Sequence, residues 1–196
     1  GRSWSSSGVR TLSLDRNRGK GAAVRHGVLA SRGDAVLMTD ADLSAPIEEL
    51  GRLTPFLELA PLVVASRAVE SSTLERPQPL PRRLLGLIFR RMARLAGVVS
   101  IRDTQCGFKL MDGEIARSLF ADVVTDGFAF DVELLWLAQR RGYGIREVGI
   151  RWGDDPDSRV RPVVGAAAMA LELVRFRWFH AEVQLSEKSR AAGTST

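Results

Sequence analysis

Two carboxylates stand one residue apart in the segment Asp40-Ala41-Asp42, directly after the apolar run at 35–38 (AVLM). A continuous apolar run of this kind is typical of a central strand that is buried on both faces of a sheet. In open α/β sheets, ligands bind outside the carboxyl ends of the strands, where this pair would lie. Neighbouring carboxylates repel each other unless a cation lies close to them, and Mg²⁺ and Mn²⁺ prefer carboxylate and phosphate oxygens. The pair therefore predicts a divalent-metal site that could neutralise a diphosphate. Alternatively, both acids cap the next helix and face water.

Strand-like and helix-like segments alternate on both sides of this pair. Apolar or alternating runs predict the strands, and helical periodicity predicts the helices between them. The alternation favours a single α/β domain over residues 1–185 with a sheet of parallel strands, followed by a disordered tail at 186–196. The expected strands are at 9–14, 35–38, 62–65, 106–111 and 143–152, the expected helices at 22–30, 47–53, 82–96, 114–120, 131–141 and 163–180, and the expected loops at 69–81 and 153–162.

The composition is that of a globular domain with anionic partners. Of the 196 residues, 45% are hydrophobic and 26% are charged, and the formal net charge is +5. This balance suits phosphorylated metabolites, an anionic membrane surface or nucleic acid. We expect no nucleic acid, because the basic residues are not interleaved with stacking aromatics in a recognisable motif. Cys106 is the only cysteine, which excludes an internal disulfide and favours a reducing compartment.

Five segments, in this order along the chain, carry a resemblance to a known family. They resemble the family-2 GT-A glycosyltransferases, and within these the dolichyl-phosphate glucosyltransferases and their bacterial polyprenyl-phosphate relatives. The resemblance covers roughly residues 9–180 and implies the GT-A fold, a Rossmann-like nucleotide-sugar transferase sheet flanked by helices. The segments are 17–23 (NRGKGAA), 39–46 (TDADLSAP), 103–109 (DTQCGFK), 128–133 (FAFDVE), and 147–152 with 158–160 (EVGIRW and SRV).

The resemblance implies that the first half of the chain binds a divalent metal, Mg²⁺ or Mn²⁺, and the nucleotide-sugar donor. In the family, the second acid of the pair is a metal ligand and the first contacts the donor or the metal, so these roles fall on Asp42 and Asp40. Lys20 could serve as a point charge for a phosphate, although it could equally be a solvated turn lysine. The implied donor contacts are Asn17, Lys20, Asp40, Ser66 and Arg67.

The second half of the chain is implied to bind the acceptor. Asp131 and Glu133 are the candidates for a catalytic base or for acceptor positioning, unless they are only helix-start acids favoured by the helix dipole. A phosphate acceptor needs little base strength, because its second pKa is about 6 and it is already a nucleophile at neutral pH. Positioning and charge stabilisation should then dominate. The implied acceptor and phosphate contacts are Asp103, Thr104, Gln105, Ser158 and Arg159.

A lipid acceptor would bring the protein to a membrane. The predicted helix at 82–96 is basic and amphipathic, so it could lie in the membrane interface with its arginines on lipid head groups. The alternative is a surface helix that packs its apolar stripe on the core. The helix at 163–180 could assist. We therefore expect a peripheral protein on the cytoplasmic face of a membrane.

The expected activity is inverting transfer of glucose from UDP-glucose to a dolichyl or polyprenyl phosphate. Two alternatives stay open: mannose transfer from GDP-mannose, and a truncated, non-catalytic remnant that binds phosphates or membrane. The family's opening segments, P-A-Y-N-E and D-D-G-S, have no counterpart here, so we expect the sheet to lack its first strands and to expose an apolar edge. Gly149 and Arg159 stand where the family usually has Pro and Lys.

Overall fold

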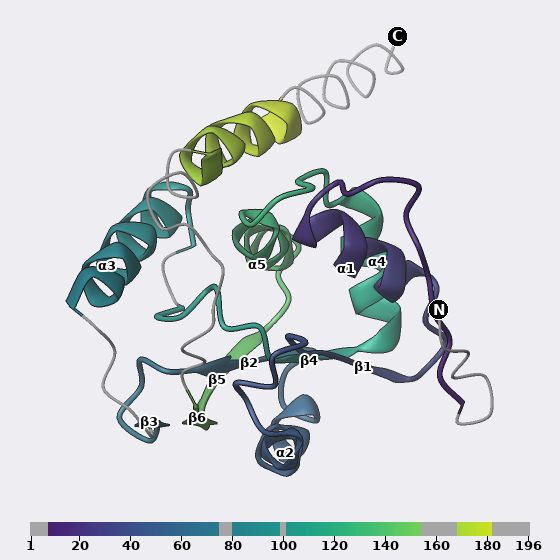
Figure 1. Cartoon of the computed structure of the whole chain (residues 1–196), viewed down its shortest axis with the longest axis vertical. Coiled ribbons are helices and arrows are strands. Elements are labelled where there is room, and N and C mark those ends of the chain that lie inside the picture. The colour runs from purple at the N-terminus through teal and green to yellow at the C-terminus, as the bar shows by residue number, and fades with distance from the viewer. Residues whose placement is uncertain (1–7, 75–79, 99–100, 154–167, 182–196) are drawn as a thin grey trace, which may run out of the picture.

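The computed structural model describes residues 8–74, 80–98, 101–153 and 168–181, and its centre is a mixed four-stranded sheet (Figure 1). The strands lie in the order β1-β4-β2-β5. β4 is antiparallel to both of its neighbours, whereas β2 and β5 are parallel. A separate small sheet pairs β3 with β6 in parallel. The strand bounds are β1 Ala35–Met38, β2 Leu62–Ser66, β3 Thr73–Leu74, β4 Lys109–Asp112, β5 Ile145–Gly149 and β6 Arg151–Trp152.

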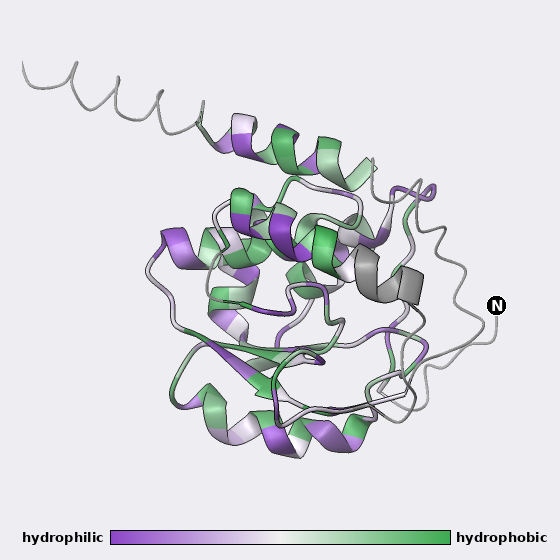
Figure 2. Ribbon diagram, turned by 90° about the vertical axis from the view of Figure 1, so that its left-hand side faces the viewer, coloured by the Kyte–Doolittle hydropathy of each residue, from purple (hydrophilic) through white to green (hydrophobic). Residues whose placement is uncertain are grey.

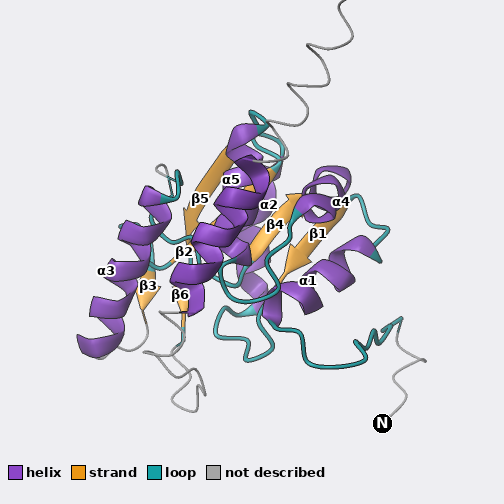
Figure 3. Ribbon diagram, turned by 90° about the horizontal axis from the view of Figure 1, so that it is seen from above, coloured by secondary structure: helices purple, strands orange, loops and turns teal. Residues whose placement is uncertain are grey.

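Helices cover both faces of the sheet (Figures 1 and 3). One face carries α1, α4 and α5, with α3 and the helical residues 168–181 on the same side, and the other face carries α2. The central strand β2 is buried along its whole length, because its side chains alternate between two hydrophobic clusters. Leu62 and Val64 pack in the larger cluster with α5, and Val63 and Ala65 pack in the smaller one with α2. The bounds are α1 Lys20–Leu29, η2 Ile47–Glu49, α2 Leu50–Leu57, α3 Leu80–Leu95, α4 Gly113–Asp122 and α5 Phe130–Arg140.

The expectation of an all-parallel sheet was wrong. β4 runs antiparallel between β1 and β2, a direction that its four-residue sequence, KLMD, does not encode. The run at 35–38 is not a central strand with two buried faces, since it has β4 as its only partner among the described strands and Ala35 is exposed.

The predicted strand at 9–14 does not form in the structure. These residues lie in a loop, with Val9 51% and Leu12 45% exposed. A strand needs a neighbour for its backbone hydrogen bonds, and no described strand pairs with this segment. The other predicted helices and strands are present with shifted ends among the described residues, and the run at 143–152 divides into β5 and β6. The predicted loop at 69–81 was wrong in part, since it contains β3 and the first residues of α3. Residues 154–162 of the other predicted loop and 163–167 of the last predicted helix lie outside the described residues. The tail at 186–196 lies outside the described residues.

Candidate functional site

Loops from four parts of the chain meet at one edge of the sheet. β1 and β2 end at this edge, and the loop at 101–108 arrives there because β4 runs in the opposite direction. The N-terminus of α1 contributes Lys20, and that of α5 contributes Asp131. The antiparallel strand that the sequence did not predict is therefore what brings the implied donor and acceptor segments together.

Asp40 lies between the implied donor segment and the loop at 101–108, which carries the implied acceptor contacts and which we call the acceptor loop. Its Oδ1 lies 2.6 Å from the Lys20 ammonium, and both side chains are about one-quarter exposed. Burial alone would lower the pKa of Lys20, but the nearby acids Asp131, Asp40 and Asp42 raise it above its ordinary value. On the other side, a Cβ added to Gly107 would overlap the Asp40 carboxylate. The glycine at position 107 thus allows the acceptor loop to lie directly against this acid.

Asp42 occupies a tight turn after β1. The Leu43 amide donates to the Asp40 carbonyl at 3.2 Å, and the Ser44 amide donates to Asp42 Oδ1 at 3.0 Å. Leu43 has a φ of 51°, a left-handed conformation that is rare for a branched side chain and is often found at functional sites. Asp42 thus accepts a hydrogen bond within the turn, and its side chain is also exposed to solvent.

The two acids fit a divalent ion that takes its remaining ligands from a phosphate. Mg²⁺ is commonly held by one or two carboxylates together with substrate phosphates and water. Asp40 already has a cation, Lys20, within ion-pair distance, so this position accepts positive charge. Within the part of the chain that the structure describes, no group of three or more His, Cys, Asp or Glu side chains could hold a metal by itself. The donor set therefore fits a phosphate-bridged ion and not an all-protein metal centre.

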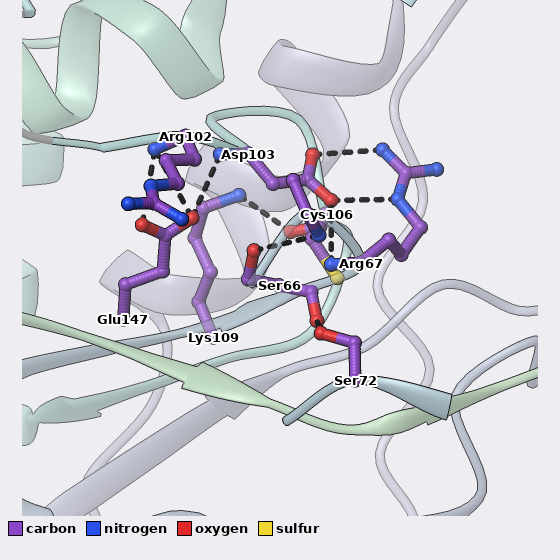
Figure 4. Close-up of polar contacts among 9 residues, drawn as sticks. Ser66, Arg67, Ser72, Arg102, Asp103, Cys106, Lys109 and Glu147 are labelled. Carbon is purple, nitrogen blue, oxygen red and sulfur yellow. Dashed lines mark hydrogen bonds and ion pairs between the residues drawn. The ribbon is translucent and has the colours of Figure 1, made fainter. Parts of the chain in front are cut away.

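Arg67 and Asp103 form a bidentate ion pair that joins the implied donor and acceptor contacts (Figure 4). Arg67 Nε and Nη2 donate to the two Asp103 oxygens at 2.7 and 2.8 Å, and the Arg67 amide donates at 3.0 Å. The guanidinium also lies 4.8 Å from the Trp152 ring centroid. Burial alone would raise the pKa of Asp103, but the facing Arg67 holds it below its ordinary value. Each of these two residues is the main partner of the other, so the first role of the pair is to hold the end of β2 against the loop at 101–108.

The remaining loop residues shape this edge. Ser66 is buried, and its Oγ accepts from the Ala68 amide at 3.1 Å while its carbonyl accepts from Ser72 Oγ at 2.7 Å (Figure 4). Thr104 is also buried. The Gln105 amide donates to the Met169 sulfur at 3.3 Å, which ties the acceptor loop to the helical residues 168–181.

Asp131 is buried against a lysine that the sequence analysis missed. Lys109 on β4 is 1% exposed, forms an ion pair with Asp131, and donates to the Cys106 carbonyl at 2.7 Å. Burial raises the pKa of Asp131, although Lys109 and Lys20 act against it. Burial likewise raises the pKa of the Cys106 thiol, to about 12. A lysine inside the apolar run FKLM was the available signal for this buried pair.

Glu133 has different partners from Asp131. Its carboxylate accepts from the Val124 and Thr125 amides at 3.0 and 2.8 Å and lies 2.7 Å from His180 Nε2. The side chain is fully buried. Glu133 therefore joins the loop before α5 to the helical residues 168–181, and His180, which sequence spacing alone does not mark, is its partner.

Asn17 shapes the turn that leads to Lys20. Its Oδ1 accepts from the Gly19 amide at 3.0 Å, and Gly19 has a φ of 115°, which favours glycine. Asp126, which the sequence analysis also missed, fixes this turn from the other side: its carboxylate pairs with Arg18 and Arg25 at 2.8 and 2.9 Å. Ser158 and Arg159 lie outside the described residues.

The sheet and helices are similar to those of solved GT-A glycosyltransferases. One is mannosyl-3-phosphoglycerate synthase from Rubrobacter xylanophilus, with a TM-score of 0.56 and 21% identity over 88% of this chain and 53% of that chain. Another is glucosyl-3-phosphoglycerate synthase from Mycobacterium tuberculosis, in complex with Mn²⁺, UDP-glucose and phosphoglyceric acid. Its TM-score is 0.56 and its identity 20%, over 81% of this chain and 53% of that chain. These similarities confirm the GT-A fold.

Curated relatives are similar over most of this chain. A dolichyl-phosphate beta-glucosyltransferase of Trichomonas vaginalis is 40% identical over 174 residues, which cover 85% of this chain and 51% of the relative. The proteins of the same name from Dictyostelium discoideum and Homo sapiens are 36% and 34% identical, over 88% and 89% of this chain and 55% and 56% of theirs. The chain thus spans about half the length of these relatives. A family model described as Glycosyl transferase family 2 matches residues 2–120, and the chain belongs to that family.

Proposed function

We propose that this chain carries the donor-phosphate and acceptor-binding part of a glycosyltransferase that moves glucose from UDP-glucose to a dolichyl or polyprenyl phosphate with inversion. One observation carries the proposal: Asp40, the first acid of the donor pair, lies against both Lys20 and Gly107 of the implied acceptor loop. Donor and acceptor segments thus share one edge of the sheet. The names of the relatives support glucose over the GDP-mannose alternative.

The donor's pyrophosphate would lie beside the acids after β1. Asp40 and Asp42 would hold Mg²⁺ or Mn²⁺, which when bound neutralises the charge that develops on the departing nucleotide. A glucosyl-3-phosphoglycerate synthase of the same fold has been solved with Mn²⁺ and UDP-glucose, which supports such an ion. Lys20, already 2.6 Å from Asp40, would shift its ammonium onto a phosphate oxygen. Asn17 would keep this turn in place.

The acceptor phosphate would approach over the loop at 101–108. It needs no strong base, because a phosphate monoester is already largely ionised at neutral pH, with a second pKa of about 6. Asp131 and Glu133 would therefore act by positioning. Asp131 orders the loop through Lys109, which also bonds the Cys106 carbonyl, and Glu133 fixes the loop before α5. Asp103, Thr104 and Gln105 would present the loop to the acceptor, with Ser158 and Arg159 as further phosphate contacts.

A lipid acceptor would bring the protein to a membrane, and we propose that it acts at the cytoplasmic face. No helix among the described residues is long and apolar enough to cross a bilayer. The basic helix α3 would lie toward the lipid head groups.

Transfer of radiolabelled glucose from UDP-glucose into a polyprenyl-phosphate lipid fraction tests the proposal. We expect Mn²⁺-dependent transfer that excess GDP-mannose does not suppress and that falls about 100-fold in Asp42→Asn. Glu58→Gln, an exposed acid at the end of α2 on the other face of the sheet, is the matched control and should keep full activity. Unchanged transfer in Asp42→Asn would remove the metal role. Binding of UDP and Mn²⁺ without any transfer would favour the non-catalytic alternative.

A further inference from the structure

The helical residues 168–181 are apolar on two sides. One side is buried at positions spaced four, three and four residues apart: Met169, Leu173, Phe176 and His180. The other side exposes Leu171 (59%), Val174 (67%) and Trp178 (65%), which are spaced three and four residues apart and which we call the outer stripe. Figure 2 shows hydrophobic residues along this helix, which lies above the rest of the fold. A helix on a protein surface normally turns a polar face outward, so the outer stripe needs a partner.

The buried side of this helix is fixed, so the helix cannot rotate to hide the outer stripe. The Trp136 ring lies 5.8 Å from the Phe176 ring and 5.3 Å from the His180 ring. Glu172 accepts a hydrogen bond from the Ala129 amide at 3.0 Å, and His180 is hydrogen-bonded to Glu133. Moving the outer stripe inward would break these contacts and leave the buried Glu133 with one partner fewer.

α3 adds a second exposed surface of the same character. It lies on the same side of the sheet as residues 168–181 (Figure 1), and it exposes Leu87 (53%), Ile88 (44%) and Leu95 (88%). Arg91 and Arg94 are exposed beside them. The sequence of α3 has five arginines and no acid. In residues 168–181 the one acid, Glu172, bonds the Ala129 amide, and the exposed charges are Arg175 and Arg177.

In α3 and residues 168–181, as far as the structure describes them, the exposed charges beside these apolar side chains are arginines, and this combination complements an anionic lipid surface. The apolar groups enter the boundary between head groups and acyl chains, and the arginines contact lipid phosphates. The same helix is tied to the acceptor loop, since Gln105 donates to Met169 at 3.3 Å. We propose that the outer stripe, together with the exposed side chains of α3, docks this protein onto an anionic membrane surface. The proposal rests on the proposed function in one respect: because the proposed acceptor is a lipid, the protein must reach a lipid surface.

Co-sedimentation with vesicles tests the docking surface. The vesicles are phosphatidylcholine alone or with phosphatidylserine, and they contain no polyprenyl phosphate. We expect the unmodified chain to sediment with the anionic vesicles, and the triple variant Leu171→Ser/Val174→Ser/Trp178→Ser to lose about tenfold in partitioning. The control is Ile47→Ser/Leu59→Ser, which changes two residues that are 52% and 67% exposed beside α2, and it should bind as the unmodified chain does. Absence of vesicle binding by the unmodified chain, or equal binding by the triple variant, overturns the proposal.

A second measurement holds even if the triple variant does not fold. Brominated lipids quench tryptophans that enter the bilayer, so they should quench the fluorescence of the unmodified chain and quench Trp178→Phe markedly less. Equal quenching of the two proteins would contradict the proposal. A concentration-dependent dimer without lipid that the triple variant abolishes would assign the outer stripe to a second copy of the chain and would also overturn it.

The outcome is separable from that of the proposed function. Vesicle binding requires neither UDP-glucose nor polyprenyl phosphate, so binding without glucose transfer would contradict the proposed function and leave the docking surface supported. Glucose transfer to a short, water-soluble polyprenyl phosphate without vesicle binding would contradict the docking surface alone.

Discussion

At the edge of the sheet where β1 and β2 end, Asp42 is exposed and shares one oxygen with the Ser44 amide, whereas Asp131 in the interior is 2% exposed and paired with Lys109. Both acids follow short apolar or aromatic segments, and both belong to segments that resemble the same family. The difference lies in their partners. The exposed acid keeps an oxygen available for a ligand, while the buried acid is neutralised within the protein. Burial and pairing, and not residue type, separate the acids that can bind the donor from those that hold the loops in place.

The largest expected effect is on the interior pair. Lys109→Met should destabilise the protein by about 3–5 kcal/mol, because it leaves Asp131 as a buried charge without its ion-pair partner. Urea denaturation measures the free energy of unfolding. The double variant Lys109→Met/Asp131→Asn should recover part of the loss, since it removes the uncompensated charge, whereas Asp42→Asn should change stability by less than about 0.5 kcal/mol. If the free energy of unfolding fell by similar amounts in Lys109→Met and Asp42→Asn, the distinction between the interior acid and the edge acid would be contradicted.

At the edge, Gly107→Ala should act on binding more than on folding. The new Cβ would overlap the Asp40 carboxylate and push it away from Lys20 and from a bound ion. We expect the Mn²⁺-dependent affinity for UDP to fall about tenfold, a loss comparable with that of one charge-assisted hydrogen bond. The control is Gly51→Ala on α2, where an added Cβ meets no atom within 4 Å and where alanine favours the helix. Calorimetry with UDP and Mn²⁺ compares the two variants, and equal affinities would show that the loop does not press on the acid.

Lys20→Met should change two affinities in opposite directions. Without UDP, Mn²⁺ should bind several-fold more tightly, because the ammonium 2.6 Å from Asp40 no longer competes with the ion. With Mn²⁺ present, UDP should bind more weakly, because a phosphate contact is lost. Lys20→Arg keeps the charge and should show neither change in full. If both affinities fall together in Lys20→Met, Lys20 has a purely structural role.

The smallest expected effect is on the pH dependence of stability. Arg67 holds the pKa of Asp103 below its ordinary value of about 3.9, so the pair contributes stability above that pH and loses it as the pH falls through the lowered pKa. Burial raises the pKa of Asp131, so protonation of this acid favours the folded state as the pH falls. We therefore expect thermal unfolding between pH 3 and 6 to show a smaller loss of stability at acid pH in Asp103→Asn than in the unmodified protein. Asp131→Asn should show a larger loss of stability. If stability fell equally with decreasing pH in the two variants, the two acids would share one electrostatic environment.

Much of the fold follows from local pattern. The apolar run at 62–65 and the helical periodicity at 131–141 place β2 and α5 within one or two residues. The direction of β4 was not predictable, because a strand as short as its four residues, KLMD, has the same sequence pattern in a parallel and in an antiparallel sheet. The predicted strand at 9–14 failed for the opposite reason: its alternation is real, but a strand also needs a neighbour, and alternation alone does not supply one.

The candidate site was predictable in its members and not in its pairings. The resemblance names Arg67 and Asp103 on separate segments, but only the fold shows that they form one bidentate pair. It names Glu133 as an acid near the acceptor, whereas its bonds to backbone amides and to His180 depend on a loop and a helix that are distant in the sequence. Lys109 could have been noticed as a charge inside an apolar strand, since such a residue is almost always paired.

Calorimetric titration of UDP into the protein with and without Mn²⁺ tests the central claim most directly, because the claim is that Asp40 and Asp42 bind the donor's pyrophosphate through a divalent ion. UDP should bind in the presence of Mn²⁺ and weaken at least about tenfold without it, and Asp42→Asn should remove the Mn²⁺ dependence while Glu58→Gln preserves it. Tight UDP binding that is independent of Mn²⁺, or Mn²⁺ dependence that persists in Asp42→Asn, would contradict the claim.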